Sequence, residues 1–138
     1  LNIPVWKGAR SDWRDVVVQG GRLGSAELYE STLRSVTFTG VKISYLNLRG
    51  ASLQDVLFTD CVIDELDLGG AKVSRVSVEG TKVGRLDVQQ SQLSNLDLRG
   101  ADLAEIVGLS ALRGATISEL QLTQLAPAFA ASLGIQIA

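Results

Sequence analysis

The chain has 138 residues, enough for one domain, and its 13 basic and 15 acidic side chains leave a net charge of −2. Because charges of both signs are interspersed, the sequence excludes a polybasic surface for direct nucleic-acid binding. One cysteine excludes an internal disulfide, and no apolar run is long enough to cross a membrane, so we expect a cytoplasmic protein.

Residues 1–10 form the first segment, and they follow only in part the period of five residues that governs the chain after them. Gly8 holds a position that this period assigns to an apolar residue. We expect residues 1–10 to be an N-terminal cap or the remnant of a longer chain. A repeat fold must cover its open end, and we expect Trp6 and Trp13 to do so as core residues in preference to forming a ligand platform.

The segment from Trp13 to Leu103 has an apolar residue at every fifth position, without exception over nineteen positions. With 46% hydrophobic residues, chance gives such a series about four times in ten million for a chosen frame. Neither a helix nor a straight strand can bury residues five apart on one side, because a helix turns by about 100° per residue and a strand alternates its faces. The chain must therefore turn about every five residues and stack as a solenoid around a continuous core. The expected repeat centres of this core include Phe38, Leu48, Phe58, Leu68, Val78 and Leu98.

A second inward series precedes the first by two residues and mostly alternates large with small side chains. Leu46, Val56 and Leu66 are large, whereas Ala51 and Cys61 are small. Residues two apart in an extended chain share a face, so this series also points toward the core. We therefore interpret Cys61 as a buried packing residue in preference to a reactive thiol.

Many five-residue units combine a small residue, a polar residue and then a large apolar residue, as in RGASL at 49–53 and RGADL at 99–103. These units resemble the repeat of the pentapeptide-repeat family over about residues 11–106, with a return at 115–117. The resemblance implies an all-β solenoid, a right-handed quadrilateral β-helix with four pentapeptides in each coil of about twenty residues. We expect this β-helix to occupy residues 11–122.

Outward columns of residues twenty apart test this register, because such residues should stack at about 4.8 Å along the rod. Along one column the charges alternate in sign, as stacked partners should: Tyr45, Glu65, Arg85 and Glu105. Another column, Asn47–Asp67–Asp87, places two carboxylates together. We interpret this column as a solvated turn in preference to a cation site.

The period fails after Leu103, and we expect an irregular coil at residues 106–114 before the pattern resumes up to Leu122. Residues 123–138 should form a short C-terminal α-helix and a tail. Leu125, Phe129 and Leu133 have helical spacing, Pro127 suits a first turn and Gly134 suits a C-terminal stop.

A helix this short is marginal alone, so its apolar side must pack on something. The favoured use is to cap the last coil. The alternative is to pair with the same helix of a second chain, with Leu125, Phe129 and Leu133 as the interface. The resemblance supports the alternative, because some members of the family dimerise through a C-terminal helix. One helix can serve both uses.

The sequence predicts no catalytic, cofactor or metal residues. It has no histidine to act as a general base, no His/Cys cluster for a metal and no phosphate-binding glycine loop. We therefore expect a non-catalytic module for protein interaction or scaffolding, or a structural appendage of a longer chain. The expected partner is another protein.

The resemblance supplies a second functional hypothesis, because some relatives inhibit or protect DNA gyrase by mimicking duplex DNA and so confer fluoroquinolone resistance. Such mimicry needs a strongly negative face. The candidate acidic residues are Asp60, Asp64, Asp67, Asp87 and Asp97. Arginines lie among them and dilute the acidic surface: Arg49, Arg75, Arg85 and Arg99. A gyrase partner is therefore the weaker hypothesis.

Overall fold

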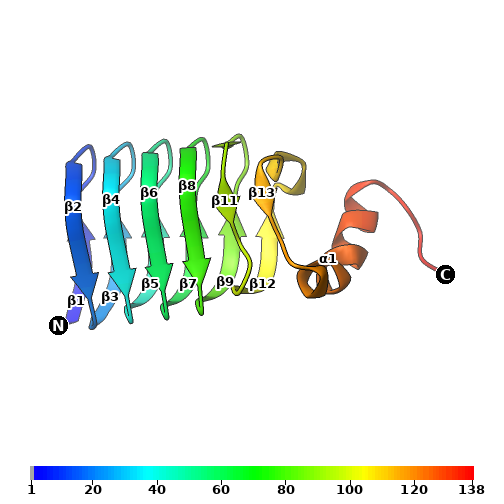
Figure 1. Cartoon of the computed structure of the whole chain (residues 1–138), viewed down its shortest axis with the longest axis horizontal. Helices are drawn as coiled ribbons and strands as arrows, with labels where there is room; N and C mark the ends of the chain where they lie inside the picture. Colours follow the sequence, from blue (N-terminus) through cyan, green and yellow to red (C-terminus); the bar gives the residue numbers. More distant parts are fainter. Residues whose placement is uncertain (1) are drawn as a thin grey trace.

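The computed structural model describes residues 2–138 and shows a rod of stacked coils with a helix at its C-terminal end (Figure 1). All paired strands are parallel, as in a solenoid in which each coil repeats the path of the one before it. They form two sheets that run the length of the rod, in the orders β1-β3-β5-β7-β9-β12 and β13-β11-β8-β6-β4-β2, with β10 also beside β8. The expected all-β solenoid with a short C-terminal helix is confirmed.

Up to β9 the strands alternate between the two sheets along the chain, and β10 and β11 then both join the second sheet. The first sheet contains β1 (Asn2–Lys7), β3 (Arg22–Glu27), β5 (Lys42–Asn47), β7 (Val62–Asp67), β9 (Lys82–Asp87) and β12 (Asp102–Val107). The second sheet contains β2 (Asp12–Gln19), β4 (Thr32–Thr39), β6 (Ser52–Thr59), β8 (Lys72–Glu79), β10 (Gln92–Leu93), β11 (Leu96–Asp97) and β13 (Ala115–Thr116). The chain ends with the 3-10 helix η1 (Leu109–Ala111) and the helix α1 (Glu119–Ser132).

The register between neighbouring strands follows the repeat. Phe38 of β4 pairs with Phe58 of β6, and Ile43 of β5 pairs with Ile63 of β7. Each coil therefore advances by twenty residues, and like side chains stack along the rod axis. Each core side chain therefore packs against the equivalent side chain of the preceding coil.

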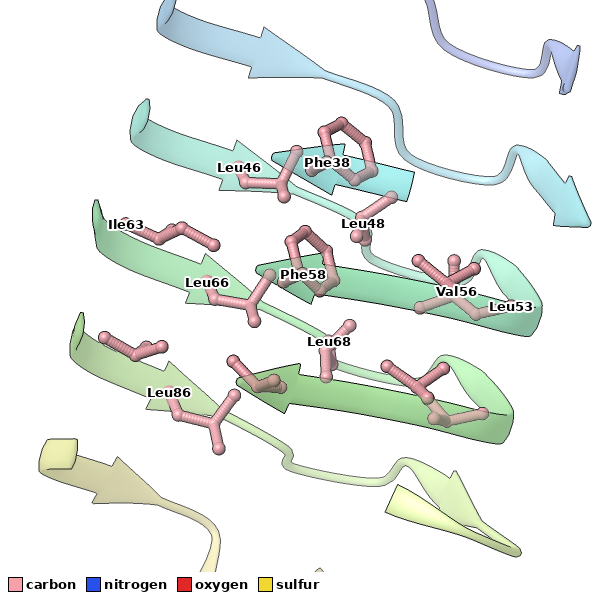
Figure 2. Close-up of a cluster of buried hydrophobic side chains, with 14 of the residues drawn as sticks. Phe38, Leu46, Leu48, Leu53, Val56, Phe58, Ile63, Leu66, Leu68 and Leu86 are labelled. Atoms are coloured by element: carbon pink, nitrogen blue, oxygen red, sulfur yellow. The ribbon is translucent and has the colours of Figure 1, made fainter. Parts of the chain in front are cut away.

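The core consists of these stacked columns (Figure 2). The rings of Phe38 and Phe58 lie parallel, with centroids 4.9 Å apart, and Leu46 stacks above Leu66 in the next column. All six expected repeat centres are buried, with no more than 1% of any side chain exposed: Phe38, Leu48, Phe58, Leu68, Val78 and Leu98. Cys61 is also buried, and burial raises the pKa of its thiol, as expected of a packing residue.

The two tryptophans lie at the N-terminal end of the rod. Trp6 and Trp13 pack with ring centroids 4.9 Å apart, and Trp13 stacks over Phe38 at 6.5 Å. Both are partly buried against the core, which supports the interpretation that they cover this end. Residues 2–7, expected to be a cap or a remnant, form strand β1 and pair with β3 in the register of the other coils.

The C-terminal end differs from the prediction at the helix boundary. Helix α1 begins at Glu119, whereas the sequence placed the start of the helical segment at 123. The stretch Leu120–Leu122 fits both a repeat and a helix, and a capping box favours the helix. The Ser118 hydroxyl accepts a hydrogen bond from the backbone amide of Gln121, and the side-chain oxygen of Gln121 accepts one from the backbone amide of Ser118. Pro127, expected in the first turn, consequently lies inside the helix.

Gln121 also joins the helix to the rod. Its side-chain amide donates to the carbonyl oxygens of Leu98 at 2.6 Å and Ala101 at 2.9 Å. A further coil would supply donors at this edge, so Gln121 takes the place of that coil and ends the solenoid. No helix among residues 2–138 has the length and hydropathy needed to span a membrane.

Candidate interaction surfaces

The described residues contain no group of three or more metal-binding side chains. Every buried side-chain nitrogen or oxygen in this part of the chain has a hydrogen-bond partner. No side chain is therefore left poised inside the rod for a ligand, and the surfaces that remain to be considered are the outer faces and the two ends.

A cluster of hydrogen-bonded polar groups surrounds Asp67 in the column Asn47–Asp67–Asp87. The side chain of Arg49 donates to both carboxylate oxygens of Asp67, at 3.1 and 3.2 Å, and the Tyr45 hydroxyl donates at 3.1 Å. The amide of Gly69 adds a bond of 2.9 Å. The interpretation of this column as a solvated turn is wrong for Asp67, which is only 6% exposed. Two of these partners, Tyr45 and Arg49, come from the neighbouring coil. The positive charge of Arg49 offsets the repulsion between the carboxylates of Asp67 and Asp87, which stack on each other.

The cluster shifts the acidity of Tyr45. Burial raises the pKa of the Tyr45 phenol from 10.0 to about 12, and the negative charge and hydrogen bond of Asp67 add to this rise. Both effects favour the protonated phenol that donates to Asp67. The cluster therefore stabilises the contact between two neighbouring coils.

We expect Tyr45 to titrate with a midpoint near pH 12, which is measurable from the absorbance of tyrosinate in a Tyr29→Phe variant, where Tyr45 is the only tyrosine left. The unfolded phenol ionises at about 10 while the folded one keeps its proton. The stability that this group contributes is thus complete below pH 10 and is lost as the pH rises through 12. Asp67→Asn should lower the midpoint. A midpoint at 10 with Asp67 intact would show that the phenol does not donate to Asp67.

Of the candidate acidic residues for DNA mimicry, Asp60 and Asp64 are exposed and Asp87 is partly exposed, and no ion pair in the part of the chain that the structure describes includes any of the three. The other two candidates are neutralised by arginines. Asp67 is buried under Arg49, and Asp97 is held by Arg99 at 2.8 Å.

The alternating charges expected in the column of Glu65, Arg85 and Glu105 are confirmed, because Arg85 lies 3.8 Å from Glu65 and 3.9 Å from Glu105. The structure adds a further pair, in which Arg75 binds Asp55 with two hydrogen bonds that lower the pKa of Asp55.

Helix α1 and the tail after it carry the exposed apolar side chains at the C-terminal end. Of the three residues predicted at an oligomer interface, Leu125 is buried, Phe129 is partly buried and Leu133 is 75% exposed. The helix inclines away from the rod, and the tail extends beyond it (Figure 1). The structure adds four exposed apolar residues that the sequence prediction missed: Leu120, Leu122, Ile135 and Ile137. The alternation of Ile135 and Ile137 was the available signal for an extended tail.

A comparison with protein families supports the fold assignment. The family model described as a pentapeptide repeat region matches residues 11–88, which is more than half of the chain. Among curated proteins, none matches this chain.

Proposed function

The chain belongs to the pentapeptide repeat family, and we propose that it is a non-catalytic module that binds other proteins. A stacked rod offers long, rigid faces whose outward residues can vary without loss of the core. The sequence contains no histidine, the usual general base near neutral pH. The observation that carries the proposal is the set of exposed apolar side chains on α1 and the tail.

Self-association through α1 is the first interaction that we propose. Gln121 and Leu125 are the only residues of the helix that are buried, so the rod covers little of it. The remaining apolar residues are spread over the helix and tail, and a second copy of the same helix would cover them with a matching apolar surface. The resulting particle would be a homodimer with two rods joined at their C-terminal ends.

Leu133→Asp is expected to convert the dimer to a monomer in sedimentation equilibrium, because it places a charge in the apolar contact without touching the core. Phe129→Asp should act in the same direction. Gln124→Glu is the matched control, since it adds a charge at an exposed position of the same helix and should leave the dimer intact. A wild-type protein that sediments as a monomer would remove this proposal.

The alternative role, mimicry of DNA toward gyrase, is the weaker proposal because arginines interrupt the acidic surface. A mimic needs rows of unneutralised carboxylates, whereas Asp67 and Asp97 each have an arginine partner. Only three of the five candidates lack an ion pair among the described residues: Asp60, Asp64 and Asp87. Protein interaction of a different kind therefore accounts better for this surface.

A further inference from the structure

Two neighbouring hollows lie on the face formed by the first halves of β4, β6 and β8 together with β10 and the η1 segment. The larger has a volume of about 520 Å³ and the smaller about 280 Å³, and both are lined by Lys72 and Ser74. We call this surface the basic face. Its outward side chains form two columns, Arg34–Gln54–Ser74 and Thr32–Ser52–Lys72–Gln92.

The side chains that line the two hollows carry positive charge and no negative charge. Arg34, Lys72 and Arg113 line the hollows, and no carboxylate does. None of the ion pairs formed among residues 2–138 includes any of these three cations. Five other arginines are paired with carboxylates: Arg10, Arg49, Arg75, Arg85 and Arg99. The remaining cations also form no ion pair in the described part of the rod: Lys7, Arg14, Arg22, Lys42 and Lys82.

The larger hollow exists because the repeat is interrupted there. β10 stops at Leu93, whereas β4, β6 and β8 continue for eight residues. The next coil leaves the regular path at η1, which brings Ser110 and Arg113 to the rim. Ser94 donates to the carbonyl oxygen of Val73 at 3.0 Å. The hydroxyls of Ser74 and Ser110 form no hydrogen bond within the described chain and can donate to a ligand.

From these observations we propose that the basic face binds an extended acidic segment of a partner protein. Arg34 of β4 and Lys72 of β8 lie two strands apart and are offset by two residues along the strand. At the usual strand spacing and rise per residue, their Cα atoms are about 12 Å apart. An extended polyproline-like peptide returns to the same side every third residue, after about 9.3 Å. Because Arg, Lys and Glu side chains are long and flexible, carboxylates three residues apart can reach both cations, while hydroxyl and amide groups between them can bind the peptide backbone.

A peptide suits this face better than a nucleic acid. No aromatic side chain lines either hollow, so bases would have no surface on which to stack. The inference rests on the proposed function and specifies the chemistry of one partner for a surface other than α1.

The test is fluorescence anisotropy with a labelled twelve-residue peptide that carries Glu at every third position, and a second peptide with Gln in place of Glu. The wild type is expected to bind the acidic peptide and not the neutral one. Lys72→Gln should weaken binding by about three- to ten-fold, because Lys72 borders both hollows and a charged hydrogen bond is lost. Arg34→Gln and Arg113→Gln should each weaken it as well.

Lys82→Gln is the matched control. Lys82 is also an exposed first residue of a strand, but it lies in β9 of the other sheet, so its neutralisation should leave the affinity unchanged. Equal weakening by Lys82→Gln and Lys72→Gln would overturn the proposal by showing diffuse charge attraction. Failure of the acidic peptide to bind more tightly than the neutral one would also overturn it, as would displacement of the peptide by a lower concentration of oligothymidylate.

The same titration with the Leu133→Asp variant separates this inference from the proposed self-association. Binding of the acidic peptide should persist in that variant, because the basic face and the exposed tail share no residue. Loss of peptide binding in Leu133→Asp would overturn the assignment of the peptide to the basic face. A wild-type dimer that ignores the peptide would refute only the basic-face inference.

Discussion

Phe58→Ala is expected to lower the free energy of unfolding by about 3–5 kcal/mol. Phe58 is 1% exposed and stacks on Phe38 at an interplanar angle of 7°. On its other side it pairs with Val78 of β8. Removing the ring therefore leaves a cavity between two neighbouring coils, and it also removes an aromatic stack.

Urea unfolding followed by circular dichroism measures this change. Leu57→Ala is the matched control, because Leu57 is the adjacent residue of β6 and is only partly buried on the outer side. Its loss should cost less than about 1 kcal/mol, in line with outward substitutions away from the core. If Phe58→Ala cost as little as Leu57→Ala, the inward register of the repeat would be wrong.

The regular part of the fold could be predicted because every coil has the same requirement, which is to bury an apolar residue at each fifth position. An apolar residue every fifth position leaves a solenoid as the only arrangement that buries all of them, so errors at single positions such as Gly8 do not change the result. The helix boundary could not be predicted in the same way. Leu120, Gln121 and Leu122 satisfy both patterns, and the local capping box of Ser118 and Gln121 favours the helix. Hydrogen bonds from Gln121 to Leu98 and Ala101, which are distant in sequence, then hold the helix on the rod.

The polar sites were harder to predict, because they arise from contacts between coils. The sequence alone predicts a solvated Asp67, because the contacts that Tyr45 and Arg49 of the preceding coil make with it arise only in the folded rod. The basic face joins cations that are far apart in the sequence, and Arg113 lies outside the regular frame. Composition alone indicated a nearly balanced surface, since it averages over the faces that the fold separates.

Gly114→Ala is the substitution with the largest expected effect outside the core. Gly114 has a φ of 94°, in the left-handed region, and a Cβ there would overlap the carbonyl oxygen of Leu93 and lie 2.7 Å from its carbon. The obstacle is backbone, which cannot move aside as a flexible side chain can. We expect a loss of about 3 kcal/mol or more, from left-handed strain and displacement of the irregular coil together.

Gly40→Ala isolates the contribution of backbone conformation. Gly40 has a φ of 63°, and a Cβ added there would meet no atom within 4 Å, so this variant should cost only about 1 kcal/mol. The two variants differ in what the added methyl group meets. The excess loss in Gly114→Ala therefore measures how closely the irregular coil lies against β10.

Hydrogen exchange locates the effect of Gly114→Ala. The amide of Leu96 donates to the carbonyl of Gly114 at 3.3 Å, and the amide of Leu98 donates to Thr116 at 2.9 Å. Displacement of the coil should expose both amides to exchange, whereas the amides of β6 should remain protected. The prediction would be contradicted if the amides of Leu96 and Leu98 stayed protected and the stability loss were no larger than that of Gly40→Ala. The irregular coil around Gly114 would then not pack against Leu93. The larger hollow of the basic face would then lose the rim that Ser110 and Arg113 provide.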